Sequence, residues 1–285
     1  MEETVKEAMG LPEDMSSEEV VKELRSHDAE YYMTTASESN PDEMLFNTIT
    51  SANGSFAYVL DGYVFTEESV DLTRPGALDG INLMVGCTSN EMGSFGADPE
   101  GTISLDEFAE AMKENYGDDY ALVYDPQDKH EAYVMNLHAS SDRWFGAFRE
   151  IAKYLNDNNE DMNVYTYFFD QDIPAHEGAA NDEFYGCFHS TELWYTFNSM
   201  RDVEGQRKWR ESDYELADQM TDYISNFVKT GDPNGEGLAE WAVGSAENDS
   251  DFMWWHDGTS ELINGRPGSE KDVMNLALAE KNLGF

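Results

Sequence analysis

The chain has 285 residues, which suits one large domain or two small ones at roughly 100–200 residues per domain. Hydrophobic residues make up 40% of it and aromatic residues 13%, so the sequence can bury a sizeable core and is no disordered acidic tail. The 59 acidic residues against 17 basic ones give a formal net charge of −42, which argues against nucleic acid and anionic membrane surfaces as partners.

The N-terminal part of the sequence predicts helices followed by short β segments. Helices are expected over 2–9 and 16–36, the second with serines that can cap it and glutamates in its first turn. Two β segments within 56–65 flank an Asp-Gly pair, which is typical of a hairpin turn. The apolar run 81–87 is bounded by turn residues and predicts a buried strand.

Amphipathic helices then alternate with strands. The sequence Ser-Leu-Asp-Glu is a capping box and predicts a helix that begins at Ser104. The apolar spacing in 141–156 predicts another helix, and the aromatic and β-branched run 163–170 predicts a strand. Helices are also expected over 192–197 and 212–229, and the breaker Gly-Asp-Pro-Asn ends the latter.

The end of the chain predicts two β segments, FMWW at 252–255 and ELI at 261–263, and then a polar tail over 264–285. Helices that alternate with only three clear buried strands are typical of the α/β class, but the strand count is low for the length. We therefore expect a few mixed or parallel core strands with surrounding helices. An α/β sheet this short leaves parallel edges uncovered, so it is expected to be an incomplete part of a larger sheet.

The sequence predicts no metal or cofactor site. It contains no CxxC and no HExxH, and its six histidines are scattered. The two cysteines, Cys87 and Cys187, are too few for a disulfide framework, and free thiols are expected. The longest apolar runs are far shorter than a membrane span.

Five stretches resemble the type-B carboxylesterases, the cholinesterase-like members of the α/β-hydrolase superfamily, in order and in spacing. They are LDGYVFTEESVDL at 60–72, INLMVGCTSNEMGSF at 81–95, VYTYFFDQDIPAHEGA at 164–179, GCFHSTELWYTF at 186–197 and DYELADQMTDYISNFVKTGDPNGEGLAEW at 213–241. Each motif alone is weak, but five in register are highly specific. The resemblance implies the C-terminal half of an α/β-hydrolase fold over 1–263, followed by the polar tail.

The resemblance also places the acid of a catalytic triad at Glu91 and its base at His189. In this family a glycine usually follows the acid directly, whereas here Met92 stands between Glu91 and Gly93. The triad of α/β-hydrolases runs along the chain as serine, acid and histidine, and Glu91 precedes His189 in that order. The implied chemistry is hydrolysis of a small carboxylic ester through an acyl-serine intermediate.

The nucleophile of that chemistry is missing from the sequence. No Gly-x-Ser-x-Gly pentapeptide occurs: the nearest string, Gly-Cys-Thr-Ser-Asn at 86–90, has threonine at the central position and lacks the final glycine. The Gly-Gly oxyanion motif of the family is missing as well. We therefore expect the serine and the oxyanion hole to come from an N-terminal half of the same fold, which is the predicted protein partner. The chain alone is expected to be inactive.

Two alternatives stand beside this interpretation: an inactive interaction module of the same fold, and a truncated remnant. A glutamate among 59 acidic residues is more often a surface charge, and a lone histidine is more often packed or solvated than catalytic. Retention of both Glu91 and His189 favours the esterase, because an inactive site has no physical need for that pair.

Overall fold

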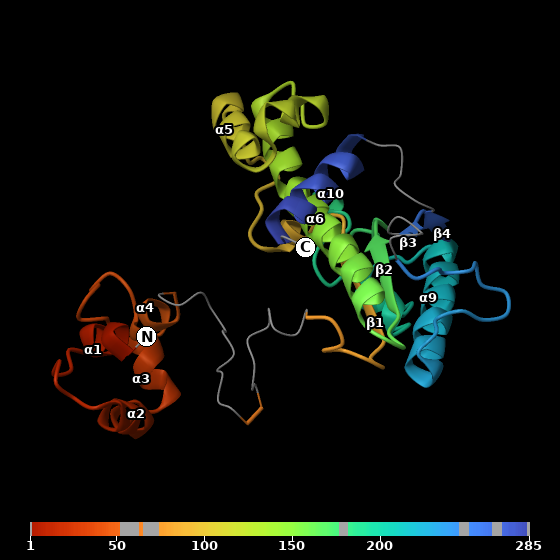
Figure 1. Cartoon of the computed structure of the whole chain (residues 1–285). Helices are drawn as coiled ribbons and strands as arrows, with labels where there is room; N and C mark the ends of the chain where they lie inside the picture. Colours follow the sequence, from red (N-terminus) through yellow and green to blue (C-terminus); the bar gives the residue numbers. More distant parts are fainter. Residues whose placement is uncertain are drawn as a thin grey trace. The chain divides into compact units, whose positions relative to one another are not determined.

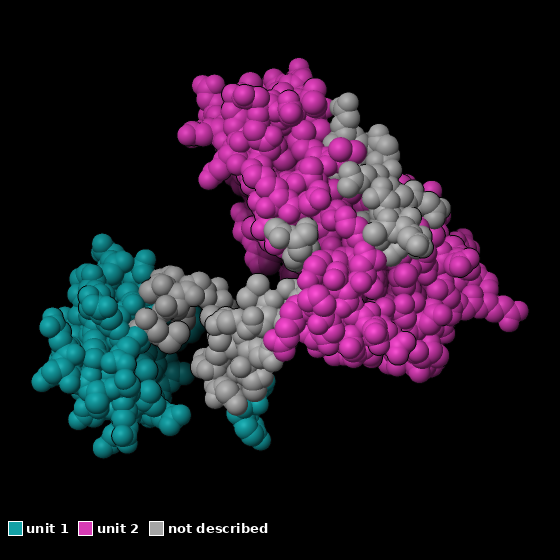
Figure 2. Space-filling view, in the orientation of Figure 1, with its two compact units in different colours: residues 1–69 teal, residues 70–285 magenta. Residues whose placement is uncertain are grey.

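The computed structural model of the chain forms two compact units, residues 1–69 and 70–285, which Figure 2 colours separately. The structure describes residues 2–51, 63–64, 74–176, 182–244, 251–263 and 270–283. Apart from residues 63–64, the hairpin predicted over 56–65 and the family-like stretch at 60–72 lie outside the described residues. Within the described part of the chain, no helix is long and apolar enough to cross a membrane.

The described part of the first unit is mainly helical (Figure 1). Its helices are α1 (Glu2–Met9), α2 (Ser17–Ser26), α3 (Ala29–Thr34) and α4 (Leu45–Ser51). As predicted, a serine starts α2, because Ser16 forms a capping box with Glu19. The single helix expected over 16–36 is interrupted, which corrects that prediction. Asp28 has an extended backbone and accepts the N–H of Tyr31 at 3.0 Å, so it caps a new helix there.

The second unit is built on a sheet whose described strands lie in the order β1-β2-β3-β4. The strands are β1 (Leu83–Thr88), β2 (Val164–Phe169), β3 (Phe252–His256) and β4 (Thr259–Ile263). The first three are parallel, and β4 returns antiparallel to β3. Thr88 pairs with Phe169, so β1 and β2 end at the same edge of the sheet. This mostly parallel sheet confirms the predicted α/β class.

Two long helices, α6 (Lys129–Asn158) and α9 (Glu211–Thr230), pack on opposite faces of the sheet (Figure 1). The faces differ because successive side chains of a strand point to opposite sides. Phe145 of α6 packs with Cys87 and Phe252 on one face. On the other face α9 shares a buried core with the strands, composed of Leu216, Ala217, Met220, Tyr223, Tyr165, Phe169, Met253 and Trp255.

Helix α6 begins twelve residues before the start predicted from its apolar stripe. Asp128 caps it, and its carboxylate accepts two backbone N–H groups of the first turn. The early turns pack on α5 (Leu105–Tyr116) instead of the sheet, with Ala132 and Ala139 buried against Phe108 and Met112. The buried residues of α6 in this contact are alanines, which mark the buried face of a helix less clearly than the large apolar residues of 141–156 do.

The segment 264–285, expected as a polar tail, contains helix α10 (Glu270–Leu283). This helix lies along α6 (Figure 1) and buries Leu276 and Ala279. The two backbones approach closely at Gly146, where a Cβ atom would meet the carbonyl oxygen of Asn275 at 2.9 Å. The docked face contains few apolar residues between charged and polar ones, which explains why the sequence alone did not reveal the helix.

Candidate active site

Glu91 lies in the turn directly after β1, at the start of the short 3-10 helix η2 (Glu91–Ser94). Its carboxylate reaches back to the end of the strand, where Oε1 accepts the backbone N–H of Thr88 at 2.7 Å. Glu91 is only 8% exposed. Gly93 permits this tight turn, because a Cβ atom there would meet the side-chain nitrogen of Asn90 at 2.5 Å. One carboxylate oxygen is therefore fixed, and Oε2 faces the neighbouring loop.

Helix α6 holds the backbone of Glu91 from the other side. Ser141 is buried, and its Oγ accepts the N–H of Glu91 at 2.9 Å. Sequence reasoning missed this residue, although a signal was present. Ser141 is a polar residue in the apolar stripe that continues at helical spacing through Phe145 and Phe148. A serine in such a stripe needs a buried partner, and the acid loop supplies it.

The loop that carries His189 is tied directly to the acid loop. The N–H of Asn90 donates to the carbonyl oxygen of Cys187 at 3.0 Å, and its side-chain amide donates to the carbonyl oxygen of Tyr185 at 3.1 Å. Ser190, directly after His189, has a φ of 71°, a left-handed conformation that is uncommon outside glycine. Backbone of this kind costs about 1–3 kcal/mol and clusters at functional sites.

The two loops bring Glu91 and His189 into contact. Nδ1 of His189 lies 2.5 Å from Oε2 of Glu91. An ionised carboxylate can only accept, so Nδ1 donates and Nε2 of the neutral ring carries the lone pair. The side chain of Glu91 is 10% exposed and that of His189 51%, and the ring of Phe95 lies 5.2 Å from the imidazole. The arrangement presents an oriented imidazole whose basic nitrogen faces away from a buried acid.

A second carboxylate, Glu192, lies in the first turn of α8 (Glu192–Thr196), and the charges of Glu91 and His189 both affect its pKa. Burial raises the pKa of its carboxyl group, and the charge of Glu91 adds to this effect while His189 opposes it. Its place in the first turn agrees with a role in the helix start. In the described part of the chain, no group of three or more His, Cys, Asp or Glu side chains is placed to hold a metal ion.

Both cysteines beside the site are free and buried, which agrees with the expectation of free thiols. Burial raises the pKa of Cys187 to about 12. Cys87 also has a raised pKa, first through burial and then through the charges of Glu91 and Asp142. Neither thiol is therefore a nucleophile at neutral pH, since the thiolate is the reactive form.

The stability of the chain should depend on these thiols at alkaline pH. An exposed thiol in the unfolded chain ionises near 8.5. The contribution of Cys187 to stability is therefore complete below about pH 8.5 and is lost as the pH rises toward 12, by about 1.4 kcal/mol per pH unit. Urea unfolding between pH 8 and pH 10 should show a steeper loss for the natural chain than for Cys187→Ala. Equal slopes would contradict this account.

Comparisons with known proteins agree with the fold. A family model described as the carboxylesterase family matches residues 3–261. The chain is similar to carboxylesterase EST55 of Geobacillus stearothermophilus in crystal structures at pH 6.8 and pH 6.2. Both comparisons give 20% sequence identity and a TM-score of 0.60, over 95% of this chain. They cover 52% and 53% of the esterase chains, so this chain spans about half the length of those structures.

Proposed function

The chain belongs to the carboxylesterase family, and on that premise we propose that it contributes the acid and the base of a serine-esterase triad. In this proposal Glu91 is the acid and His189 the base. The 2.5 Å contact between Nδ1 of His189 and Oε2 of Glu91 is the observation that carries it. The substrate class is a small carboxylic ester, in line with the family.

The geometry supports a separate role for each of the two side chains, His189 and Glu91. With Nδ1 bound to Glu91, Nε2 of His189 is free to take the proton of a serine hydroxyl as the serine oxygen attacks the ester carbonyl. The imidazolium then gives that proton to the departing alcohol, which leaves an acyl-serine. Water repeats the sequence and releases the carboxylic acid. Throughout, the buried carboxylate holds the ring and stabilises its charged form.

The serine and the oxyanion hole are proposed to come from an N-terminal half of the fold. The chain spans about half of the similar esterase structures. Among the described strands, β1 is outermost and pairs with β2 on one side only. A parallel strand added at its outer edge would end beside the loop of Glu91. A serine elbow at that position would lie at the same sheet edge as His189.

Coexpression of the chain with a serine-bearing N-terminal half tests the proposal. That half should be sought in the DNA upstream of Met1, read in all frames for a Gly-x-Ser-x-Gly elbow. The expected result is a complex that hydrolyses p-nitrophenyl butyrate and whose serine reacts with a fluorophosphonate probe. A stable complex with an intact elbow that turns over no ester would contradict the proposal.

The contact between Ser141 and the acid loop predicts a stability effect. Ser141→Ala should lower the free energy of unfolding by about 1–3 kcal/mol, because it leaves the buried N–H of Glu91 without an acceptor. Urea unfolding measures the change. Ser140→Ala is the matched control on the same helix, since Ser140 is half-buried and accepts from the Arg143 side chain at 3.1 Å, and not from the backbone of the acid loop in the described contacts. Its effect should stay below about 0.5 kcal/mol, and equal losses in both variants would refute the role of Ser141.

A further inference from the structure

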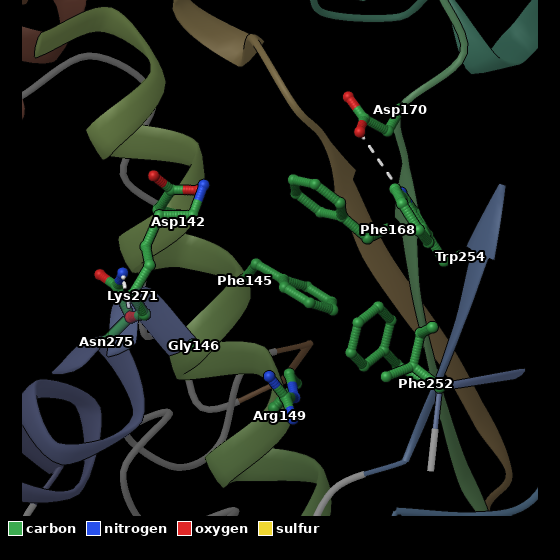
Figure 3. Close-up of a pocket in the computed structure, with 11 residues that line it drawn as sticks. Asp142, Phe145, Gly146, Arg149, Phe168, Asp170, Phe252, Trp254, Lys271 and Asn275 are labelled. Carbon is green, nitrogen blue, oxygen red and sulfur yellow. Dashed lines mark hydrogen bonds and ion pairs between the residues drawn. The ribbon is translucent and has the colours of Figure 1, made fainter. Parts of the chain in front are cut away.

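A cavity of about 250 Å³ lies between α6, the sheet and α10, and neither Glu91 nor His189 lines it. It opens on the face of the sheet that α6 covers. Four aromatic side chains contribute to its wall: Phe145 from α6, Phe168 from β2, and Phe252 and Trp254 from β3 (Figure 3). Ile263 at the end of β4 completes the apolar lining. The cavity is therefore separate from the proposed catalytic pair.

The aromatic wall is preorganised. The ring of Phe145 lies 4.7 Å from that of Phe168 and 4.8 Å from that of Phe252, the latter in an edge-to-face arrangement. The guanidinium of Arg149 lies 4.8 Å from the centroid of the Phe252 ring and closes one end of the cavity. These mutual contacts hold the rings in place, so a flat apolar ligand can insert without a large ordering cost.

The opposite end of the cavity is polar. Figure 3 shows Asp170 there, with Arg149 at the far end and the aromatic rings between them. Oδ2 of Asp170 accepts the indole N–H of Trp254 at 3.3 Å. A carboxylate has about four acceptor sites on its two oxygens, so Asp170 can accept a further hydrogen bond from a ligand.

The volume sets the size of that ligand. A cavity of about 150 Å³ lined by apolar side chains is large enough for benzene. At about 250 Å³ this cavity accepts one aromatic ring or two fused rings. We propose that it binds a flat aromatic compound of one or two rings, whose hydroxyl or N–H group donates to Asp170. The proposal does not depend on ester hydrolysis.

Titration of the purified chain with 2-naphthol, followed by ligand-observed NMR, tests the proposal. The natural chain should bind the probe at one saturable site. Ile263→Trp places an indole at the cavity wall and should weaken binding about tenfold or more. Leu262→Trp is the matched control, because Leu262 is the neighbour on β4 and packs into the core on the other face of the sheet. It should leave the affinity unchanged.

A second comparison needs no variant. The probe 2-methoxynaphthalene has the same rings without the donor, and it should bind the natural chain about tenfold more weakly. Circular dichroism and melting curves establish that both tryptophan variants are folded. Three results would each overturn the proposal: no saturable binding of 2-naphthol, equal affinities of the two tryptophan variants, or equal affinities of the natural chain for the two probes.

Discussion

The purified chain is expected to hydrolyse p-nitrophenyl butyrate no faster than its own His189→Ala variant. In a serine hydrolase, loss of the nucleophile alone lowers kcat by about 10⁶-fold. The residual acceleration comes from the oxyanion hole and from substrate binding. Here the Gly-Gly oxyanion motif is missing from the sequence together with the serine elbow, so the residual acceleration is also expected to be lost. Without a positioned ester carbonyl, His189 gains no effective molarity as a base on water.

The assay compares initial rates of the natural chain, His189→Ala and buffer at equal protein concentration. Buried thiols offer no substitute nucleophile, because Cys87 and Cys187 both have raised pKa values. A rate far above buffer that vanishes in His189→Ala would show a nucleophile within these 285 residues, and the division of the triad between two halves would be wrong.

In complex with a serine-bearing N-terminal half, the same substitutions should have very large effects. His189→Ala should lower kcat by about 10⁶-fold, because the serine loses its base. Glu91→Gln should lower it by about 10⁴-fold, because an amide in place of the carboxylate favours the wrong tautomer of the ring. Both effects should appear in kcat more than in KM, since neither side chain is expected to bind the ground-state ester.

His256 provides a matched control, because it is another histidine flanked by carboxylates. Its Nδ1 lies 3.3 Å from Asp257 and its Nε2 3.3 Å from Glu261, at the turn between β3 and β4. His256→Ala should leave kcat unchanged in the complex. Equal losses for His256→Ala and His189→Ala would mean that the histidines act on folding, and the assignment of His189 as base would not stand.

Much of the second unit could be predicted because its elements carry strong local patterns. The capping box at Ser104 and Glu107 starts α5 where predicted, and the aromatic run 163–170 forms β2. Local sequence patterns did not predict elements whose structure depends on a contact between distant segments of the chain. Helix α10 packs closely on α6 because small residues such as Gly146 let the two backbones approach. Such packing, which stabilises the helix, cannot be inferred from the local sequence of either helix.

The candidate site shows the same difference between residues that the sequence identifies and residues that only the fold reveals. Glu91 and His189 were found through motifs that resemble a family, since nothing local distinguishes either residue from a surface acid or a packed histidine. Sequence reasoning did not identify Ser141 or Asn90, which hold the two loops in place. Their partners lie about 50 and 95 positions away along the chain. Only the fold brings such pairs together, because β1 and β2 end at a common edge and α6 packs against the turn that follows β1.

The nitrogen-15 NMR shifts of the His189 ring test the central claim most directly, because they report which ring nitrogen carries the proton. The ring signals are assigned by their loss in His189→Ala. With Glu91 accepting from Nδ1, the neutral ring should be protonated at Nδ1 and bare at Nε2. In Glu91→Gln the side-chain amide can donate to Nδ1, and the proton should move to Nε2. A natural chain protonated at Nε2, or one whose His189 shifts do not respond to Glu91→Gln, would contradict an acid–base pair formed by Glu91 and His189.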